Sequence, residues 1–443
     1  MCHMKLCSVA QRHADGRNHI SHTCNIRLLI SSMFATKREH FRSTLLTIAE
    51  SPNPLLGRYR NTPGAPQVGD SGCEPQRKDS PFMTSPMTSL FDPLDAGDLH
   101  LDNRVTMAAL TRQRAGEDGI PTDLHVEYYS QRASAGLVVT EGSFPAFSNR
   151  AFPGQAGIAT DEQAAGWARV AESVHAKGGT LVMQIMHGGR TSHPDLLRGA
   201  EPEAPSAIAV GGPVRGFSGK AEGGVPRELG TEEIPRIIEE FTSAARRAID
   251  AGVDGVEIHS ANGYLLHEFL GASSNHRTDA YGGSPENRAR LTTEVVAAVA
   301  AEIGAGRTAV RISPEHGIQG VLEDDRQDVL ATYDALIDGL NEVGPAYLSV
   351  LHKDIDGDLV THLRGRFDGA FLLNSGFSKI TGQDEASHIV EDDLADAAVV
   401  GRNLIANPDL VRRWRDGLEL NVPDQTTFYA PGAKGYTDYA FAE

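Results

Sequence analysis

The sequence predicts a closed barrel of eight parallel strands wrapped by helices, the (β/α)8 or TIM-barrel class. Eight short runs of apolar and β-branched residues alternate with amphipathic helical patterns after residue 103, which is typical of βα units in a parallel sheet. No Gly-rich dinucleotide fingerprint opens the first unit, which disfavours a doubly wound sheet. Polar side chains also gather just beyond one strand, the place where barrel enzymes carry their chemistry.

The expected strands are short and follow one another at the spacing of βα units. They cover residues 104–110, 136–141, 180–186, 254–258, 308–312, 346–350, 370–374 and 397–400. The clearest helices cover residues 161–177, 231–251, 285–303 and 326–342. In the second helix Thr231 can cap the amino terminus, and two glutamates favour the first turn. The connection from His187 to Gly230 is longer than a βα loop needs, and we expect a lid or hairpin over the third strand.

The first 86 residues differ from the rest of the chain. They hold all four cysteines, a Pro/Gly/Ser-rich run, 11 Lys and Arg and 6 Asp and Glu. Their net charge is therefore +5, and since the whole chain carries −18, residues 87–443 carry −23. We expect a disordered or non-native extension over 1–86, with Met83 or Met87 as the natural start, and one barrel domain over 87–443. A transit peptide or a metal site is the alternative, but the cysteine spacing fits no regular zinc pattern.

Composition excludes several classes of function. No run of about 18 apolar residues indicates a membrane span, and the acidic barrel region disfavours a nucleic-acid partner. Residues 87–443 contain no cysteine, which excludes a disulfide, an iron–sulfur cluster and a cysteine nucleophile there. No metal site is predicted. We expect a cytoplasmic monomer or homodimer that acts on a small molecule.

Three polar side chains lie immediately beyond the strand at 254–258. His259, Asn262 and Tyr264 fall within six residues, in the run VEIHSANGYLLHEF, and each can donate a hydrogen bond. One such residue alone would more simply be a turn or a cap, but three together favour an active site. With the turn-rich run 277–287, this segment resembles the active-site segment of the Old Yellow Enzyme family of flavin-dependent alkene reductases. The resemblance covers the chain after Met87 and implies FMN as cofactor and NADPH or NADH as reductant.

The resemblance assigns cofactor contacts to the ends of the first three strands. Ala109 and Thr111 end the run RVTMAALTR, Gly142 follows LVVTE, and Gln184 lies in MQIMHGG. The Thr111 hydroxyl and the Gln184 amide would bond the flavin, and Gly142 would let it approach the backbone. Taken alone, Thr111 would be a turn residue. Gln184 would otherwise lack a partner inside the barrel, which favours function over packing.

A buried arginine is expected inside the strand TAVRI. A guanidinium there is costly unless an anion lies beside it. The resemblance places Arg311 against the flavin's pyrimidine, where it would stabilise the negative charge of the reduced ring. The alternative is an ion pair with Glu257 inside the barrel.

Backbone N–H groups and a cation follow the last two strands. Asn374 and Gly376 come after the seventh strand, and Gly401 and Arg402 after the eighth. Barrels commonly bind phosphate at this position, and FMN carries a phosphate. The resemblance therefore assigns these four residues to the cofactor.

The resemblance also implies a mechanism. His259 and Asn262 would hydrogen-bond the carbonyl or nitro oxygen of an electron-poor alkene such as an enone or a maleimide, and Tyr264 would protonate its α-carbon. Asn262 cannot ionise, so polarisation depends on hydrogen bonds and at most one imidazolium.

Other positions are expected to set the substrate range. Met186 and Phe152 stand where many family members have Trp and Tyr, and Ala109 where Pro is usual. Met is flexible, so the pocket should be wider. Tyr429, in the run FYAPGAKGYTDY, either reaches over the site or anchors the tail.

Two other functions remain open. One is a relative that reduces dienoyl-CoA thioesters through an iron–sulfur cluster, which the lack of cysteine in the barrel disfavours. The other is a barrel that binds flavin without turnover, and the sequence does not distinguish it from an enzyme.

Overall fold

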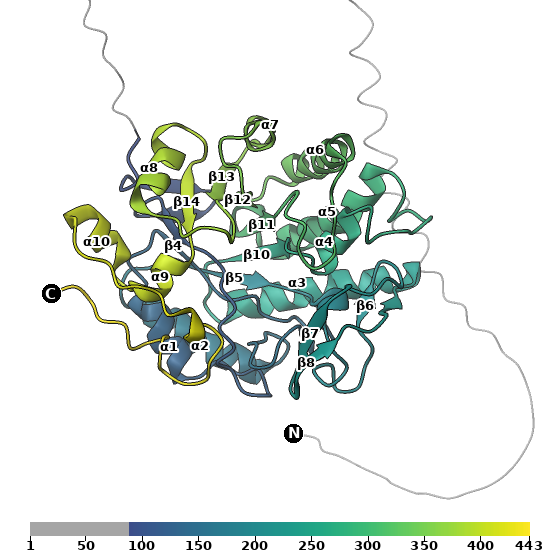
Figure 1. Ribbon diagram of the computed structural model, residues 1–443, viewed down its shortest axis with the longest axis horizontal. Helices are drawn as coiled ribbons and strands as arrows, with labels where there is room; N and C mark the ends of the chain where they lie inside the picture. Colours follow the sequence, from purple (N-terminus) through teal and green to yellow (C-terminus); the bar gives the residue numbers. More distant parts are fainter. Residues whose placement is uncertain (1–87) are drawn as a thin grey trace, which may run out of the picture. The chain divides into compact units, whose positions relative to one another are not determined.

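The computed structural model describes residues 88–443. Its centre is a closed barrel of parallel strands (Figure 1). In barrel order the strands are β3 (Val105–Met107), β4 (Leu137–Val139), β5 (Leu181–Ile185), β10 (Gly255–Ser260), β11 (Thr308–Ile312), β12 (Tyr347–Leu351), β13 (Ala370–Asn374) and β14 (Ala397–Val400). Each predicted strand overlaps an observed one, which confirms the fold class. The predictions for residues 1–86, including the start at Met83 or Met87, lie outside the described residues.

Helices connect the strands and cover the barrel. They are α1 (Asp123–Gln131), α2 (Asp161–His175), α3 (Ile234–Asp250), α4 (Leu265–Leu270), α5 (Pro285–Ile303), α6 (Arg326–Val343), α7 (Asp358–Arg366), α8 (Gln383–Glu391), α9 (Arg402–Ala406) and α10 (Leu410–Asp416). Helix α5 has the predicted bounds because Ser284 caps its amino terminus and Gly304 ends it with φ of 95°. The expected cap at Thr231 is wrong: this residue starts a 3-10 turn, and its hydroxyl bonds Asp279.

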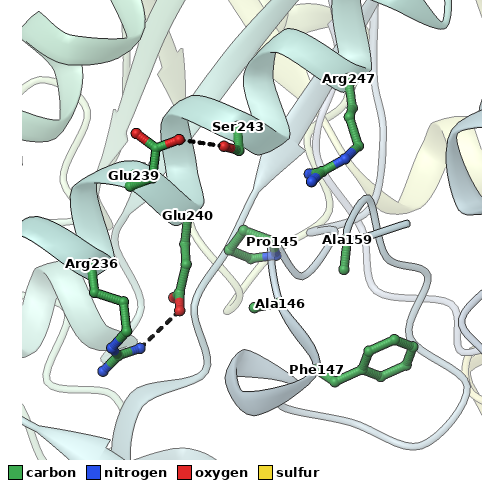
Figure 2. A pocket seen from close by; sticks show the side chains of 9 residues that line it. All are labelled: Pro145, Ala146, Phe147, Ala159, Arg236, Glu239, Glu240, Ser243 and Arg247. Atoms are coloured by element: carbon green, nitrogen blue, oxygen red, sulfur yellow. Dashed lines mark hydrogen bonds and ion pairs between the residues drawn. The ribbon is translucent and has the colours of Figure 1, made fainter. Parts of the chain in front are cut away.

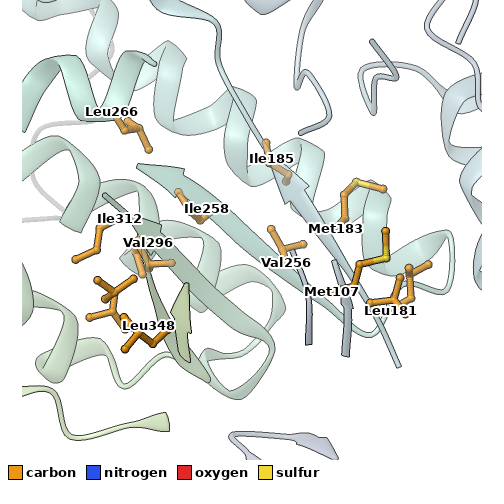
Figure 3. Close-up of a cluster of buried hydrophobic side chains, with 14 of the residues drawn as sticks. Met107, Leu181, Met183, Ile185, Val256, Ile258, Leu266, Val296, Ile312 and Leu348 are labelled. Atoms are coloured by element: carbon orange, nitrogen blue, oxygen red, sulfur yellow. The ribbon is translucent and has the colours of Figure 1, made fainter. Parts of the chain in front are cut away.

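The period-two alternation of the strands divides the core into two parts. Outward-facing residues such as Val256, Ile258 and Ile312 pack beneath the helices (Figure 3). Inward-facing Val182 and Tyr347 join a second cluster with the hairpin of β1 (Leu94–Ala96) and β2 (Leu99–Leu101). Apolar side chains therefore fill the amino-terminal half of the barrel. Polar inward positions further along the same strands are left for the carboxyl-terminal half.

The long connection after β5 contains the expected hairpin. Strand β7 (Pro213–Gly216) pairs antiparallel with β8 (Gly219–Glu222), and β6 (Glu203–Ala204) pairs with β9 (Arg227–Glu228). Arg227 bonds Glu203 and Glu233, so its guanidinium ties the base of this connection to the start of α3. Within residues 88–443, no helix is both long and apolar enough to cross a membrane. The same residues form no cluster of His, Cys, Asp and Glu that could hold a metal ion.

Candidate active site

A cavity of about 510 Å³ opens at the carboxyl ends of the barrel strands. Its wall includes many of the predicted site residues: Ala109, Thr111, Phe152, Gln184, Met186, His259, Asn262, Tyr264, Arg311, Arg402 and Tyr429. Residues from the first strand's end to the C-terminal segment thus meet around one space. The predicted residues Gly142, Asn374, Gly376 and Gly401 are not among its lining residues.

The strand register brings three of these side chains together. In the parallel pairing of β10 with β11, His259 lies opposite Arg311, and in that of β10 with β5, Glu257 lies opposite Gln184. Side chains two residues apart on a strand share a face. The barrel interior therefore has a layer of polar side chains on the carboxyl-terminal side of its apolar core.

A left-handed turn directs the substrate residues into the cavity. Asn262 and Gly263 have φ of 57° and 76°, a region that Asn tolerates and Gly favours. A Cβ on Gly263 would lie 2.6 Å from the carbonyl oxygen of Ile318. The backbone N–H of Asn262 donates to the hydroxyl of Ser313. These contacts end β10 abruptly and place Tyr264 at the start of α4.

The three side chains are held in their uncharged forms. Burial, with help from the nearby Arg311 charge, lowers the pKa of His259 well below its usual value. Burial raises the pKa of the Tyr264 hydroxyl. Nδ1 of His259 and Oδ1 of Asn262 are buried without a hydrogen-bond partner in the described part of the chain. Unpaired polar atoms of this kind are costly in a protein interior unless a ligand satisfies them.

The ion pair between Arg311 and Glu257 considered from the sequence is not formed. Glu257 accepts hydrogen bonds from Gln184 at 2.7 Å and from the Tyr347 hydroxyl at 3.0 Å. Within residues 88–443, the buried Arg311 guanidinium has no ion-pair or hydrogen-bond partner and lines the cavity. The expectation that Gln184 would lack a protein partner is wrong, since its Nε2 donates a hydrogen bond to Glu257. Its amide oxygen remains as an acceptor.

The predicted phosphate site lines the cavity only in part. Arg402 lines the cavity, and its guanidinium donates to the carbonyl of Phe377. Asn374 donates to the carbonyl of Val399 and accepts from the N–H of Gly376, so both have structural bonds. Gly401 precedes the short helix α9. Of the four predicted residues, only Arg402 lines the cavity.

The substrate end is apolar and aromatic. Phe152 packs edge-on against Tyr264, with ring centres 6.1 Å apart, and Met186 belongs to the same buried cluster. A Cβ on Gly142 would lie 3.0 Å from the sulfur of Met186, so this glycine lets the methionine pack closely. Tyr429 is half exposed at the mouth, and the guanidinium of Arg215 lies 5.4 Å from its ring centre.

Several lining residues were missed from the sequence. They come from connections and the C-terminal segment: Leu110, Arg112, Gln113, Arg215, Ile318, Gln319, Phe377, Ile405, Gln425 and Phe428. Arg215 lies on β7, within the connection expected to form a lid, but the sequence did not show that its side chain lines the cavity. Gln319 had a weak signal, because it precedes a glycine soon after the strand that carries Arg311. The others had none.

A second hollow, of about 400 Å³, lies outside the barrel between α3 and the residues around Phe147 (Figure 2). Both of its glutamates are hydrogen-bonded by other lining residues: Arg236 donates to Glu240 at 2.8 Å, and Ser243 donates to Glu239 at 2.6 Å. None of the predicted site residues reaches it. The barrel cavity is therefore the candidate active site.

The cavity fits an anionic aromatic cofactor. Its lining holds four arginines (Arg112, Arg215, Arg311 and Arg402) and no acidic residue, although the chain carries a net charge of −18. Arg311 is buried and forms no ion pair within residues 88–443, which suits the negative charge that a reduced flavin carries. A TIM barrel with this cavity at its carboxyl end has a lining that suits a flavin-dependent oxidoreductase.

Comparison with known proteins specifies the family. Residues 89–421 match the sequence model of the NADH:flavin oxidoreductase / NADH oxidase family, and the chain belongs to this family. A probable flavin mononucleotide-dependent alkene reductase of Leishmania infantum is 40% identical, covering 80% of this chain and 97% of the relative. The Old Yellow Enzyme homologue from Zymomonas mobilis is 38% identical with a TM-score of 0.76, covering 80% of this chain and 100% of that one. Morphinone reductase in complex with tetrahydroNAD is 41% identical with a TM-score of 0.76, covering 80% and 98%.

Proposed function

We propose that this protein is an FMN-dependent alkene reductase that takes electrons from NADPH or NADH. Its substrates are electron-poor alkenes such as enones and maleimides, with nitro compounds as a further class. The observation that carries the proposal is the group of uncharged donors, His259, Asn262 and Tyr264, on one wall of a cationic cavity. The relatives named alkene reductase and morphinone reductase support the same reaction.

The cofactor would be held by residues on the barrel strands and in the segments that follow them. Arg311 would face the flavin ring and Arg402 its phosphate, while Thr111 and the free oxygen of Gln184 would bond polar atoms of the ring. The backbone near Ala109 would lie against the same ring. When bound, FMN supplies the hydride that it receives from NAD(P)H.

The substrate oxygen would be bound by His259 and Asn262. Because the lowered pKa keeps the imidazole neutral, it donates one N–H, and the Asn262 amide donates another. These bonds draw electron density from the double bond and orient it in the cavity. Met186 and Phe152 would contact the apolar part of the substrate.

Tyr264 would donate the proton to the α-carbon. Its O–H bond breaks as the new C–H bond forms, and the hydroxyl is protonated beforehand over the whole physiological range because burial raises its pKa. The raised pKa also means that the phenolate left behind needs a nearby donor.

Purified protein loaded with FMN should oxidise NADPH or NADH and reduce 2-cyclohexenone. Tyr264→Phe should slow reoxidation of the reduced enzyme by the enone about 10²- to 10⁴-fold while leaving reduction by NAD(P)H intact. Tyr281→Phe, outside the cavity, is the matched control because this hydroxyl bonds Glu294. A protein that binds no flavin would overturn the proposal. A protein that binds flavin and turns over no alkene would instead be a flavin-binding barrel.

A further inference from the structure

Gln319 lies on the loop between β11 and α6 and lines the cavity next to the Asn262 turn. Its φ is 55°, and that of the following Gly320 is 73°. A residue with a side chain occupies this left-handed region only where its surroundings hold it there. A Cβ on Gly320 would lie 2.6 Å from the carbonyl oxygen of Val210. The packing of the loop therefore sets the direction of the Gln319 side chain.

The loop and the substrate turn are joined at several points. Nε2 of Gln319 donates to the backbone carbonyl of Asn262 at 2.5 Å. A Cβ on Gly263 would lie 2.6 Å from the Cβ of Gln319, which shows how closely the two segments pack. The Gln319 carbonyl accepts from the Arg190 guanidinium at 3.3 Å, and the Arg190 N–H donates to Glu268 on α4. Gln319 is therefore held at its backbone carbonyl by Arg190 and at its side-chain amide by the Asn262 carbonyl.

Gln319 also lies beside Tyr264, since both residues line the cavity and Gln319 packs against Gly263, the residue before Tyr264. Burial raises the pKa of Tyr264, and the nearby Gln319 amide opposes that rise. A primary amide carries two N–H groups. One N–H donates to the Asn262 carbonyl, and the other makes no hydrogen bond within residues 88–443, so it is available to the Tyr264 oxygen. No lining residue of the cavity carries a negative charge that would compete for this donor.

We propose that Gln319 is a positioning residue for proton transfer, which holds Tyr264 and stabilises the phenolate formed when its proton leaves. The inference rests on the proposed function. In the step, the electron pair at the substrate α-carbon takes the proton, the O–H bond of Tyr264 breaks, and its electron pair stays on the phenolic oxygen. The second N–H of Gln319 donates to that oxygen until water returns a proton.

Two variants separate this role from a structural one. Gln319→Met keeps the length of the side chain and removes both donors. It should slow reoxidation of the reduced enzyme by 2-cyclohexenone roughly 10- to 100-fold, the loss expected for a hydrogen bond to a charged group. Reduction by NADPH and the amount of bound FMN should stay as in the wild type. Gln327→Met is the matched control, because Gln327 is exposed on α6 and does not line the cavity.

Gln319→Glu gives a readout that a structural role would not produce. An ionised carboxylate cannot donate and repels the forming phenolate, whereas a protonated carboxyl can donate. Reoxidation by the enone should therefore recover as the pH falls through the carboxyl's pKa, a pH dependence absent from the wild type and from Gln319→Met. A flat profile would overturn the inference.

Tyr264→Phe and the double variant with Gln319→Met distinguish the two proposals. The Met substitution should have no further effect on reoxidation once the hydroxyl is gone. If Tyr264→Phe is slow and Gln319→Met is as fast as the wild type, the role of Gln319 is refuted and the alkene reductase stands. If Tyr264→Phe is itself as fast as the wild type, Tyr264 is not the proton donor, and both assignments fall.

Discussion

The carboxyl group of Glu268 should make the stability of this protein depend on pH. Glu268 lies on α4, four residues after Tyr264, and is fully buried. One of its oxygens accepts the N–H of Arg190 at 2.9 Å, while the other has no partner in the described part of the chain. Burial raises the pKa of this carboxyl to about 8. Its charged form is therefore unfavourable in the folded protein.

The sign of the effect follows from proton binding. Between the ordinary carboxyl pKa, near 4.5, and about 8, the folded state keeps a proton that the unfolded chain has lost. Stability therefore falls as the pH rises through this window, by up to about 1.4 kcal/mol per pH unit. From pH 5.5 to 7.5 this one group should cost about 2–3 kcal/mol. Above pH 8 both states are ionised, and the loss is complete.

Glu268→Gln removes the titration and keeps an acceptor for Arg190. The free energy of unfolding, measured with urea at saturating FMN, should rise by about 2–3 kcal/mol relative to the wild type between pH 5.5 and 7.5. Glu342→Gln is the control, since Glu342 is exposed on α6, and it should follow the wild type at both pH values. A constant difference between Glu268→Gln and the wild type would show that Glu268 is ionised in the folded state and refute the reasoning.

Three further predictions test the site. Gly263→Ala should destabilise the protein by about 1–3 kcal/mol, because a Cβ there meets a backbone carbonyl at φ of 76°. Gly304→Ala is the control for the cost of the backbone conformation alone, since φ there is 95° and no atom of residues 88–443 lies within 4 Å of an added Cβ. Equal melting temperatures for the two variants would contradict the packing argument. Arg311→Met should weaken FMN binding about 10- to 100-fold by equilibrium dialysis, and an unchanged Kd would remove Arg311 from the cofactor site. Because burial keeps His259 neutral, the KM for 2-cyclohexenone should stay flat between pH 6 and 8, whereas a KM that changes with a midpoint near 6.5 would show a titrating imidazole.

Most of the barrel could be predicted because its signals are local. Alternation in TAVRI puts Val310 and Arg311 on opposite faces of the strand whatever the rest of the chain does. The start of α5 is marked by Ser284, and its end by Gly304. The first strand was predicted too long, since pairing stops at Met107. Ala109 and Leu110 after it leave the sheet and line the cavity, but their apolar character does not mark where the strand ends.

The contacts inside the barrel depended on register. The sequence indicated that Arg311 and Gln184 point inward. It could not indicate that Glu257 would bond Gln184 and leave Arg311 free, because that choice is made by the offset between neighbouring strands. For the same reason, the structural bonds of Asn374 could not be anticipated.

Local sequence was sufficient for the class of fold and for the position of His259, Asn262 and Tyr264 at the end of one strand. The rest of the cavity depends on segments far apart in the chain. Tyr429 reaches the mouth because Arg112 and Arg114 bond the carbonyl of Phe428, and Gln319 reaches Asn262 because packing holds it at a positive φ. Strand periodicity is a property of neighbouring residues, whereas a loop takes the conformation that its distant contacts impose.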